Sequence, residues 1–155
     1  MDISRSGPVL VVDDYADGRE MLAEYLSFRG FAVAAAQSGV EALSVAAQVN
    51  PSVVLMDLRM PDMDGWEATR RLRGTAGTAD AIIVAVTAHA LANEVKRALA
   101  AGCDAVVSKP YDLASFADAL ATAMQTGPKV LKDFGNQTRA ESVPKPLPAS
   151  QNKKR

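Results

Sequence analysis

Residues 53–57 read VVLMD, a short apolar run that ends on an aspartate. Three further apolar runs each end on residues that carry a carboxylate, a hydroxyl or an ammonium group: VLVVDD (9–14), IIVAVT (82–87) and AVVSK (105–109). Continuous apolar runs of this length, separated by helical patterns, are typical of strands that are buried on both faces of a parallel sheet. The four runs therefore predict four parallel strands.

The segments between these runs predict helices, because apolar side chains recur in them at helical spacing. The predicted helices cover residues 16–29, 38–48, 65–73, 91–101 and 113–124. A further strand is expected over FAVAAA, residues 31–36. Five strands that alternate with five helices predict an α/β fold, with a doubly wound, five-stranded parallel sheet and helices on both of its faces.

Polar groups gather at one rim of this predicted sheet. Ligands of parallel sheets lie beyond the carboxyl ends of the strands. There the chain places three carboxylates, one hydroxyl and one ammonium group: Asp13, Asp14, Asp57, Thr87 and Lys109. Clustered carboxylates repel one another unless a cation lies among them, and a few carboxylates completed by water and phosphate oxygens are the usual ligands of Mg²⁺. The sequence thus predicts an acidic metal site with a lysine beside it.

The bulk composition is that of one globular domain. The chain has 155 residues, of which 48% are hydrophobic and 23% are charged, and these values are ordinary for a folded protein. No apolar stretch approaches the roughly 20 residues that span a bilayer, and the chain opens without a secretory signal pattern. Its single cysteine argues against a disulfide framework. We therefore expect a cytoplasmic protein without a membrane span.

Charge divides the chain into an acidic core and a basic tail. Residues 128–155 contain seven Lys or Arg and two acidic residues, a net charge of +5, so residues 1–127 carry −6 of the total of −1. An acidic core argues against direct binding of nucleic acid. The tail contains prolines and little apolar material beyond a short spot at Val130, Leu131 and Phe134. We predict one domain over residues 1–127 and a mostly disordered tail over residues 128–155.

Four motifs together resemble the receiver domain of two-component response regulators: VVDD (11–14), VLMDLRMPDMDGWE (54–67), VAVTAHA (84–90) and VVSKP (106–110). Their order, their spacing and their position at strand ends are similar to those of that family over about residues 8–126. Among receivers, the stand-alone and phosphorelay types are the most similar. The resemblance implies the flavodoxin-like receiver fold and a phosphoprotein of signal transduction.

The resemblance also implies a role for each residue of the predicted site. Asp57 would be the phosphoacceptor, and Thr87 and Lys109 would bind the oxygens of the phosphoryl group once it is transferred. The metal, Mg²⁺ or Mn²⁺, would be held by three carboxylates and one backbone carbonyl, those of Asp13, Asp14, Asp57 and Arg59. Pro110 would turn the chain after the lysine, and Gly65 would allow a sharp turn into the following helix.

A receiver of this kind takes its phosphoryl group from the phosphohistidine of a histidine kinase or of a histidine phosphotransfer protein. It catalyses only its own phosphorylation and dephosphorylation, and it acts by binding a protein or by passing the group on. No DNA-binding output domain is expected in this chain. The downstream partner is expected on the face formed by the Leu91–Ala101 helix, the last strand and the Leu113–Met124 helix.

Several positions bear on how such a receiver would operate here. Receivers usually carry Tyr or Phe three residues before the lysine, where this chain has Val106. This puts in question the usual coupling of that aromatic to the threonine. Tyr111 is a candidate to pack at the same face, and the alternative is that Val106 is plain strand core and the signal passes through shifts of loops and helices. Arg59 and His89 lie two residues beyond the phosphoacceptor and the threonine, beside the path of the hydrolytic water in receivers. Slow self-dephosphorylation is one hypothesis, and side chains that point to solvent are the other.

Three other functions compete with this interpretation. A phosphatase of the haloacid dehalogenase family needs a second aspartate two residues after its nucleophile, where this chain has Arg59. A flavodoxin-like FMN module needs a phosphate loop rich in Ser, Thr and Gly after the first strand, where this chain has DDYAD (13–17). A receiver-like scaffold that works without phosphorylation is compatible with the sequence, although the complete acidic set and Lys109 argue against it.

Overall fold

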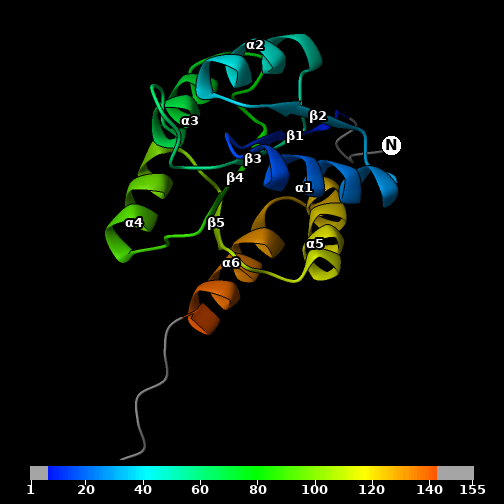
Figure 1. The fold of residues 1–155 in the computed structure, drawn as a ribbon, viewed down its shortest axis with the longest axis vertical. Helices are drawn as coiled ribbons and strands as arrows, with labels where there is room; N and C mark the ends of the chain where they lie inside the picture. The colour runs from blue at the N-terminus through cyan, green and yellow to red at the C-terminus, as the bar shows by residue number, and fades with distance from the viewer. Residues whose placement is uncertain (1–6, 143–155) are drawn as a thin grey trace, which may run out of the picture.

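The computed structural model of the protein describes residues 7–142. Its centre is a five-stranded, entirely parallel sheet with the strand order β2-β1-β3-β4-β5. The strands are β1 (Val9–Val12), β2 (Val33–Ala36), β3 (Val53–Met56), β4 (Ile82–Thr87) and β5 (Ala105–Ser108). Within this order β2 and β5 are the edge strands, and the chain crosses from one half of the sheet to the other between β2 and β3 (Figure 1).

Helices cover both faces of this sheet. They are α1 (Ala16–Phe28), α2 (Gly39–Val49), α3 (Gly65–Arg73), α4 (Ala92–Ala101), α5 (Leu113–Thr126) and α6 (Lys129–Ser142). Side chains from α2, α3 and α4 form one apolar cluster with Leu10 and Val12 of β1. Those from α1, α5 and α6 form a second cluster with Val9 and Val11. Because successive strand residues point to opposite faces, β1 divides its side chains between the two clusters, and the predicted doubly wound fold is confirmed.

Short polar side chains begin three of these helices. Ser38 accepts a hydrogen bond from the Glu41 N–H at the start of α2, and the Glu41 carboxylate accepts one from the Gln37 N–H. Asp64 and Asp112 accept bonds from the N–H groups three residues later, at the starts of α3 and α5. Such caps satisfy backbone donors that have no partner within the helix. The starts of α2, α3 and α5 therefore follow from local sequence.

The prediction of a disordered tail is wrong for residues 129–142, which form α6. Leu131 is fully buried, and Val130 and Phe134 pack against the apolar cluster on the α1 and α5 face. The apolar spot at these residues is the buried side of an amphipathic helix. Its few apolar residues are enough to hold the helix in place because it lies against β5 and α5. The rest of the predicted tail, residues 143–155, lies outside the described residues.

Candidate functional site

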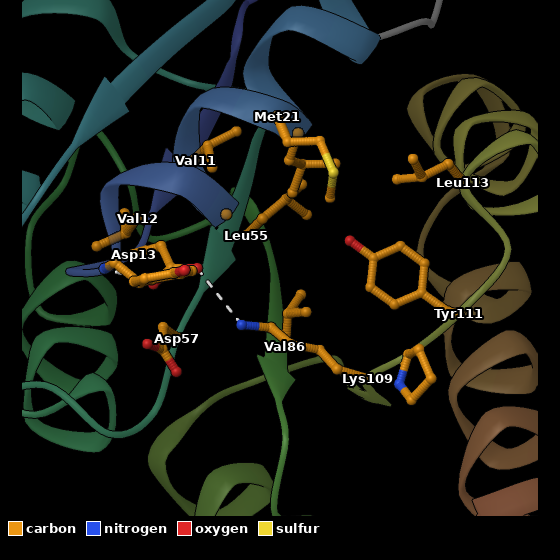
Figure 2. Close-up of a pocket in the computed structure, with 14 residues that line it drawn as sticks. Val11, Val12, Asp13, Met21, Leu55, Asp57, Val86, Lys109, Tyr111 and Leu113 are labelled. Carbon is orange, nitrogen blue, oxygen red and sulfur yellow. Dashed lines mark hydrogen bonds and ion pairs between the residues drawn. The ribbon is translucent and has the colours of Figure 1, made fainter.

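Three carboxylates meet at the carboxyl end of the sheet. Oxygen atoms of Asp13, Asp14 and Asp57 lie within 4.8 Å of one another. The cause is the pairing of β1 with β3, in which Val12 lies opposite Met56 and the Asp57 N–H donates to the Val12 carbonyl at 3.0 Å. The residues that follow the two strands are thereby neighbours, and Figure 2 shows the Asp13 and Asp57 side chains close together. The sequence prediction of an acidic cluster at this rim is confirmed.

The surrounding chain fixes the Asp13 carboxylate. One oxygen, Oδ1, accepts a hydrogen bond from the Tyr15 N–H at 2.9 Å. The other, Oδ2, lies 3.4 Å from the Lys109 ammonium group, and this ion pair is the dashed line in Figure 2. Asp13 is buried, whereas Asp14 is exposed. The site therefore has a buried acid held by a backbone N–H and by Lys109, which comes from the other half of the sheet, and an exposed acid beside it.

The surroundings of the Asp57 carboxyl disfavour its ionised form. Its burial is the largest effect that raises its pKa, the negative charge of Asp13 adds to it, and Lys109 opposes it; together they bring the pKa to about 7. One ammonium group thus does not neutralise the three carboxylates of the cluster. Hard oxygen ligands with excess negative charge are the donor set that a divalent cation prefers. The acidic cluster therefore fits a divalent metal ion.

Thr87 ends β4 and Lys109 directly follows β5, on the same rim. Thr87 lies opposite Ser108 in the pairing of β4 with β5, and the Lys109 N–H donates to the Thr87 carbonyl at 2.9 Å. The Thr87 hydroxyl is buried and accepts a hydrogen bond from the His89 N–H at 3.1 Å. The structure thus joins Lys109 directly to the acidic cluster, while the Thr87 hydroxyl is bonded to its own loop. The peptide bond between Lys109 and Pro110 is cis.

Arg59 is held at the site by its backbone and by its side chain. Its N–H donates a hydrogen bond of 3.4 Å to Asp57 Oδ1. Its guanidinium group forms an ion pair with the carboxylate of Glu94 in α4, so the side chain is engaged rather than free in solvent. Glu94 is a buried residue that sequence reasoning missed, because a glutamate in the first turn of a helix has the pattern of an ordinary exposed residue.

Gly65 is required for a reason that the sequence did not reveal. It begins α3, its N–H donates to the Leu58 carbonyl at 2.9 Å, and a Cβ placed on it would overlap the Asp57 carbonyl oxygen and lie 2.7 Å from the Leu58 Cα. From the sequence, a glycine was expected here for a sharp turn. The structure shows instead that the backbone of α3 approaches the backbone of the Asp57 loop too closely for any side chain.

An apolar cavity of about 340 Å³ opens beside Asp57, between α1 and the loop after β5. Its lining includes Tyr15, Met21, Tyr111 and Leu113, and Figure 2 shows the last three around one opening with Asp57 and Lys109 below. Tyr15 is 64% exposed and Met21 is 58% exposed. Met21 shares the helical spacing of the buried Leu22 and Leu26, yet it lines the cavity and is exposed. No local signal distinguishes a residue at the rim of a cavity from one in the core.

The predicted partner face is partly covered. α6 contacts both β5 and α5, so two of the three elements proposed for that face already carry a segment of the chain. Leu99 of α4 is 45% exposed, and Leu91, the residue that caps its N-terminus, is 61% exposed. Exposed apolar side chains of this face therefore remain at α4, beside the exposed polar residues of α5.

Comparison with known proteins agrees with this geometry. The profile of the response regulator receiver domain matches residues 9–121. Among curated proteins, the sensor histidine kinase RcsC of Escherichia coli strain K12 is 41% identical over 105 residues, which are 68% of this chain and 11% of that protein. The response regulator MprA of Mycobacterium tuberculosis is 42% identical over 105 residues, 68% of this chain and 45% of that protein. The chain thus spans about a tenth of one relative and under half of the other.

Solved structures show the same architecture. The chemotaxis protein CheY4 of Vibrio cholerae superposes with a TM-score of 0.71 at 27% identity, over 75% of this chain and 97% of that one. A CheY-like receiver domain from Methanospirillum hungatei has a TM-score of 0.73 at 24% identity, over 79% and 97% of the two chains, and shows the fold alone. Within residues 7–142, no helix is long and apolar enough to cross a membrane.

Proposed function

Because the chain belongs to the response regulator receiver family, we propose that it accepts a phosphoryl group on Asp57 from a phosphohistidine. The observation that carries the proposal is the position of the Asp57 carboxylate, which lies in a cluster with Asp13 and Asp14 while Lys109 reaches the same cluster from β5. Phosphoryl transfer depends on positioning and on charge neutralisation more than on covalent assistance. A half-buried nucleophile among fixed charges meets that need.

In the proposed reaction, an Asp57 oxygen attacks the phosphorus atom and forms an acyl phosphate. The bond between phosphorus and the donor's imidazole nitrogen breaks, and that nitrogen keeps the electron pair and takes up a proton. Lys109 then leaves Asp13 for an oxygen of the transferred group, and the Thr87 hydroxyl donates a hydrogen bond to another. Hydrolysis by water returns the Asp57 carboxylate and inorganic phosphate, so the protein catalyses only reactions of its own side chain.

The proposal includes a divalent cation, Mg²⁺ or Mn²⁺. Asp13, Asp14, Asp57 and the backbone carbonyl of Arg59 are the residues that would hold it, and its positive charge would offset the three carboxylates and the phosphoryl oxygens. The raised pKa of Asp57 supports this part of the proposal, because burial and the negative charge of Asp13 both disfavour the ionised carboxylate and Lys109 offsets them only in part. The cation would thus keep Asp57 ionised as the nucleophile at neutral pH.

The proposed donor is a histidine kinase or a histidine phosphotransfer protein in the cytoplasm, and the proposed output is protein binding or onward transfer. The apolar cavity beside Asp57 supports a protein donor, because the exposed side chains of Tyr15 and Met21 offer apolar contact at the mouth of the site. The acidic charge of residues 1–127 argues against nucleic acid as a direct partner.

Phosphorylation by a small donor tests the proposal. The protein is incubated with Mg²⁺ and acetyl phosphate, and its intact mass is measured. We expect a gain of one phosphoryl group that requires Mg²⁺, is lost in Asp57→Asn and is retained in Asp62→Asn, a matched control at an exposed aspartate of the same loop. If the folded, metal-loaded protein gains no mass, the scaffold function replaces this one.

A further inference from the structure

α6 runs along β5, which is the outer strand of the sheet (Figure 1). Gly135 lies so close to this strand that a Cβ on it would overlap the Val106 carbonyl oxygen. The Ser108 N–H donates to the Thr138 hydroxyl at 3.1 Å, and the Arg139 guanidinium donates to the Val106 carbonyl. α6 therefore binds backbone groups of the edge strand, which are otherwise available to another protein.

Aromatic side chains hold the other side of α6. The Phe134 ring lies 5.5 Å from that of Phe116 in α5 and 6.5 Å from that of Tyr111, measured between ring centroids. The Tyr111 and Phe116 rings are 4.7 Å apart. Leu131 is fully buried in the same apolar cluster. Together with the contacts to β5, these side chains make α6 a docked amphipathic helix rather than a loose extension of α5.

One four-residue segment, 108–111, touches both α6 and the acidic site. Ser108 bonds to Thr138, and Tyr111 packs on Phe134. Lys109 lies between these two residues, and its ammonium group pairs with Asp13. Tyr111 also lines the cavity beside Asp57. A displacement of the Lys109 backbone must therefore disturb contacts that α6 makes with the residues on either side of it.

We propose that α6 is an autoinhibitory segment, which covers the β5 and α5 face in the unphosphorylated protein and is loosened when Asp57 is phosphorylated. The inference rests on the proposed function, because the event that moves Lys109 is its transfer from Asp13 to a phosphoryl oxygen. The contacts of Ser108 and Tyr111 with α6 are made with the unphosphorylated loop, so a shift of the loop weakens them. A downstream protein that binds β5 and α5 then competes with α6 for the same groups.

The proposed autoinhibition by α6 also gives a role to the segment around Val106. Val106 is buried and its carbonyl oxygen is an acceptor for α6, while Tyr111, five residues later, places an aromatic side chain near the site. Tyr111 links the cavity beside Asp57 to Phe134 of α6. The signal would thus leave the site through the loop after β5 instead of through an aromatic residue within β5.

Hydrogen exchange measured by mass spectrometry tests the proposal in the full chain. Beryllium fluoride with Mg²⁺ serves as a stable mimic of the phosphoryl group. We expect peptides from residues 129–142 to exchange at least about fivefold faster with the mimic bound, with no change in peptides from α2 and no response in Asp57→Asn. If mass gain from acetyl phosphate shows that Asp57 is phosphorylated but exchange in α6 is unchanged, this inference alone fails. If Asp57 takes up no phosphoryl group, both the proposed function and this inference fail.

Affinity for the mimic provides the reciprocal test. If the mimic loosens α6, then loosening α6 must tighten binding of the mimic by the same factor. Gly135→Ala places a Cβ against the Val106 carbonyl and so weakens docking, whereas Lys132→Ala alters an exposed residue of the same helix. We expect the Kd of beryllium fluoride to fall about fivefold in Gly135→Ala and to stay at the wild-type value in Lys132→Ala. Equal Kd values in all three proteins, with the domain folded by circular dichroism, would overturn the proposal.

Discussion

The guanidinium group of Arg59 forms an ion pair with the buried carboxylate of Glu94, which joins the loop after Asp57 to α4. The backbone carbonyl of Glu94 also accepts a hydrogen bond from the Trp66 indole N–H at 3.4 Å. The two bonds tie α3, α4 and the Asp57 loop together at one residue. Arg59 therefore has a structural role beside the one proposed for its backbone.

Arg59→Ala is expected to destabilise the protein by about 2 kcal/mol, because it leaves the buried Glu94 carboxylate without its partner. The measurement is the free energy of unfolding in urea. Arg71→Ala is the matched control, since it removes an exposed ion pair with Glu67 and should cost less than about 1 kcal/mol. Adding Glu94→Gln to Arg59→Ala should recover part of the loss. Equal effects of the Arg59 and Arg71 substitutions would contradict this role.

Gly65→Ala is expected to lower both stability and phosphorylation. The new Cβ would overlap the Asp57 carbonyl oxygen, and relief of such overpacking costs about 1–3 kcal/mol and displaces the Asp57 loop. Gly74→Ala is the control, because the nearest atom to a Cβ there is 3.6 Å away, so it should leave phosphorylation unchanged. Unfolding in urea and the initial rate of mass gain from acetyl phosphate measure the two effects. A Gly65→Ala protein with normal values for both would refute the close-approach argument.

Stability without metal is expected to depend on pH through Asp57. The pKa of this carboxyl is about 7 in the folded protein and 3.8 ordinarily, so the folded state binds its proton more tightly than the unfolded state. The free energy of unfolding should therefore decrease as pH rises from about 4 to 7. The measurement is urea unfolding in EDTA, expressed as the difference between wild type and Asp57→Asn. A difference that does not vary with pH would rule the effect out.

Addition of Mg²⁺ at pH 7–8 should reverse this loss of stability, because an ion that binds only the folded protein stabilises it. The expected result is a higher midpoint of unfolding in wild type with Mg²⁺ than in EDTA. The increase should be smaller in Asp57→Asn, which lacks one of the three carboxylates. An increase of the same size in both proteins would show that the ion acts elsewhere.

Cys103 is expected to react slowly with thiol reagents in the native protein. Burial raises its pKa to about 11 from an ordinary value of 9.0, which lowers the thiolate fraction at pH 8 by about a hundredfold. The measurement is the rate of labelling with a chromogenic disulfide reagent, and the protein unfolded in urea is the control. Similar rates in the two states would show that the thiol is accessible.

Local sequence predicted the five strands, the helices α1 to α5 and the members of the acidic cluster. The apolar runs before Asp13 and Asp57 are buried strands because their composition leaves no solvent-facing side. Parallel pairing then brings their ends together, so that the cluster follows from order and spacing alone. The caps at Ser38, Asp64 and Asp112 are likewise local, since each accepts from a backbone group three residues away.

Only the tertiary structure decided the contacts that have no periodic pattern. The pairing of Arg59 with Glu94, the approach of Gly65 to Asp57 and the docking of α6 through Gly135 join residues whose proximity is set by how the layers pack. Composition predicted a disordered tail because α6 has few apolar residues, but Leu131 and Phe134 are enough once α5 and the edge of β5 provide a surface. Periodicity indicates which face of a helix or strand is apolar. Which other element that face packs against is fixed by the packing of the whole chain.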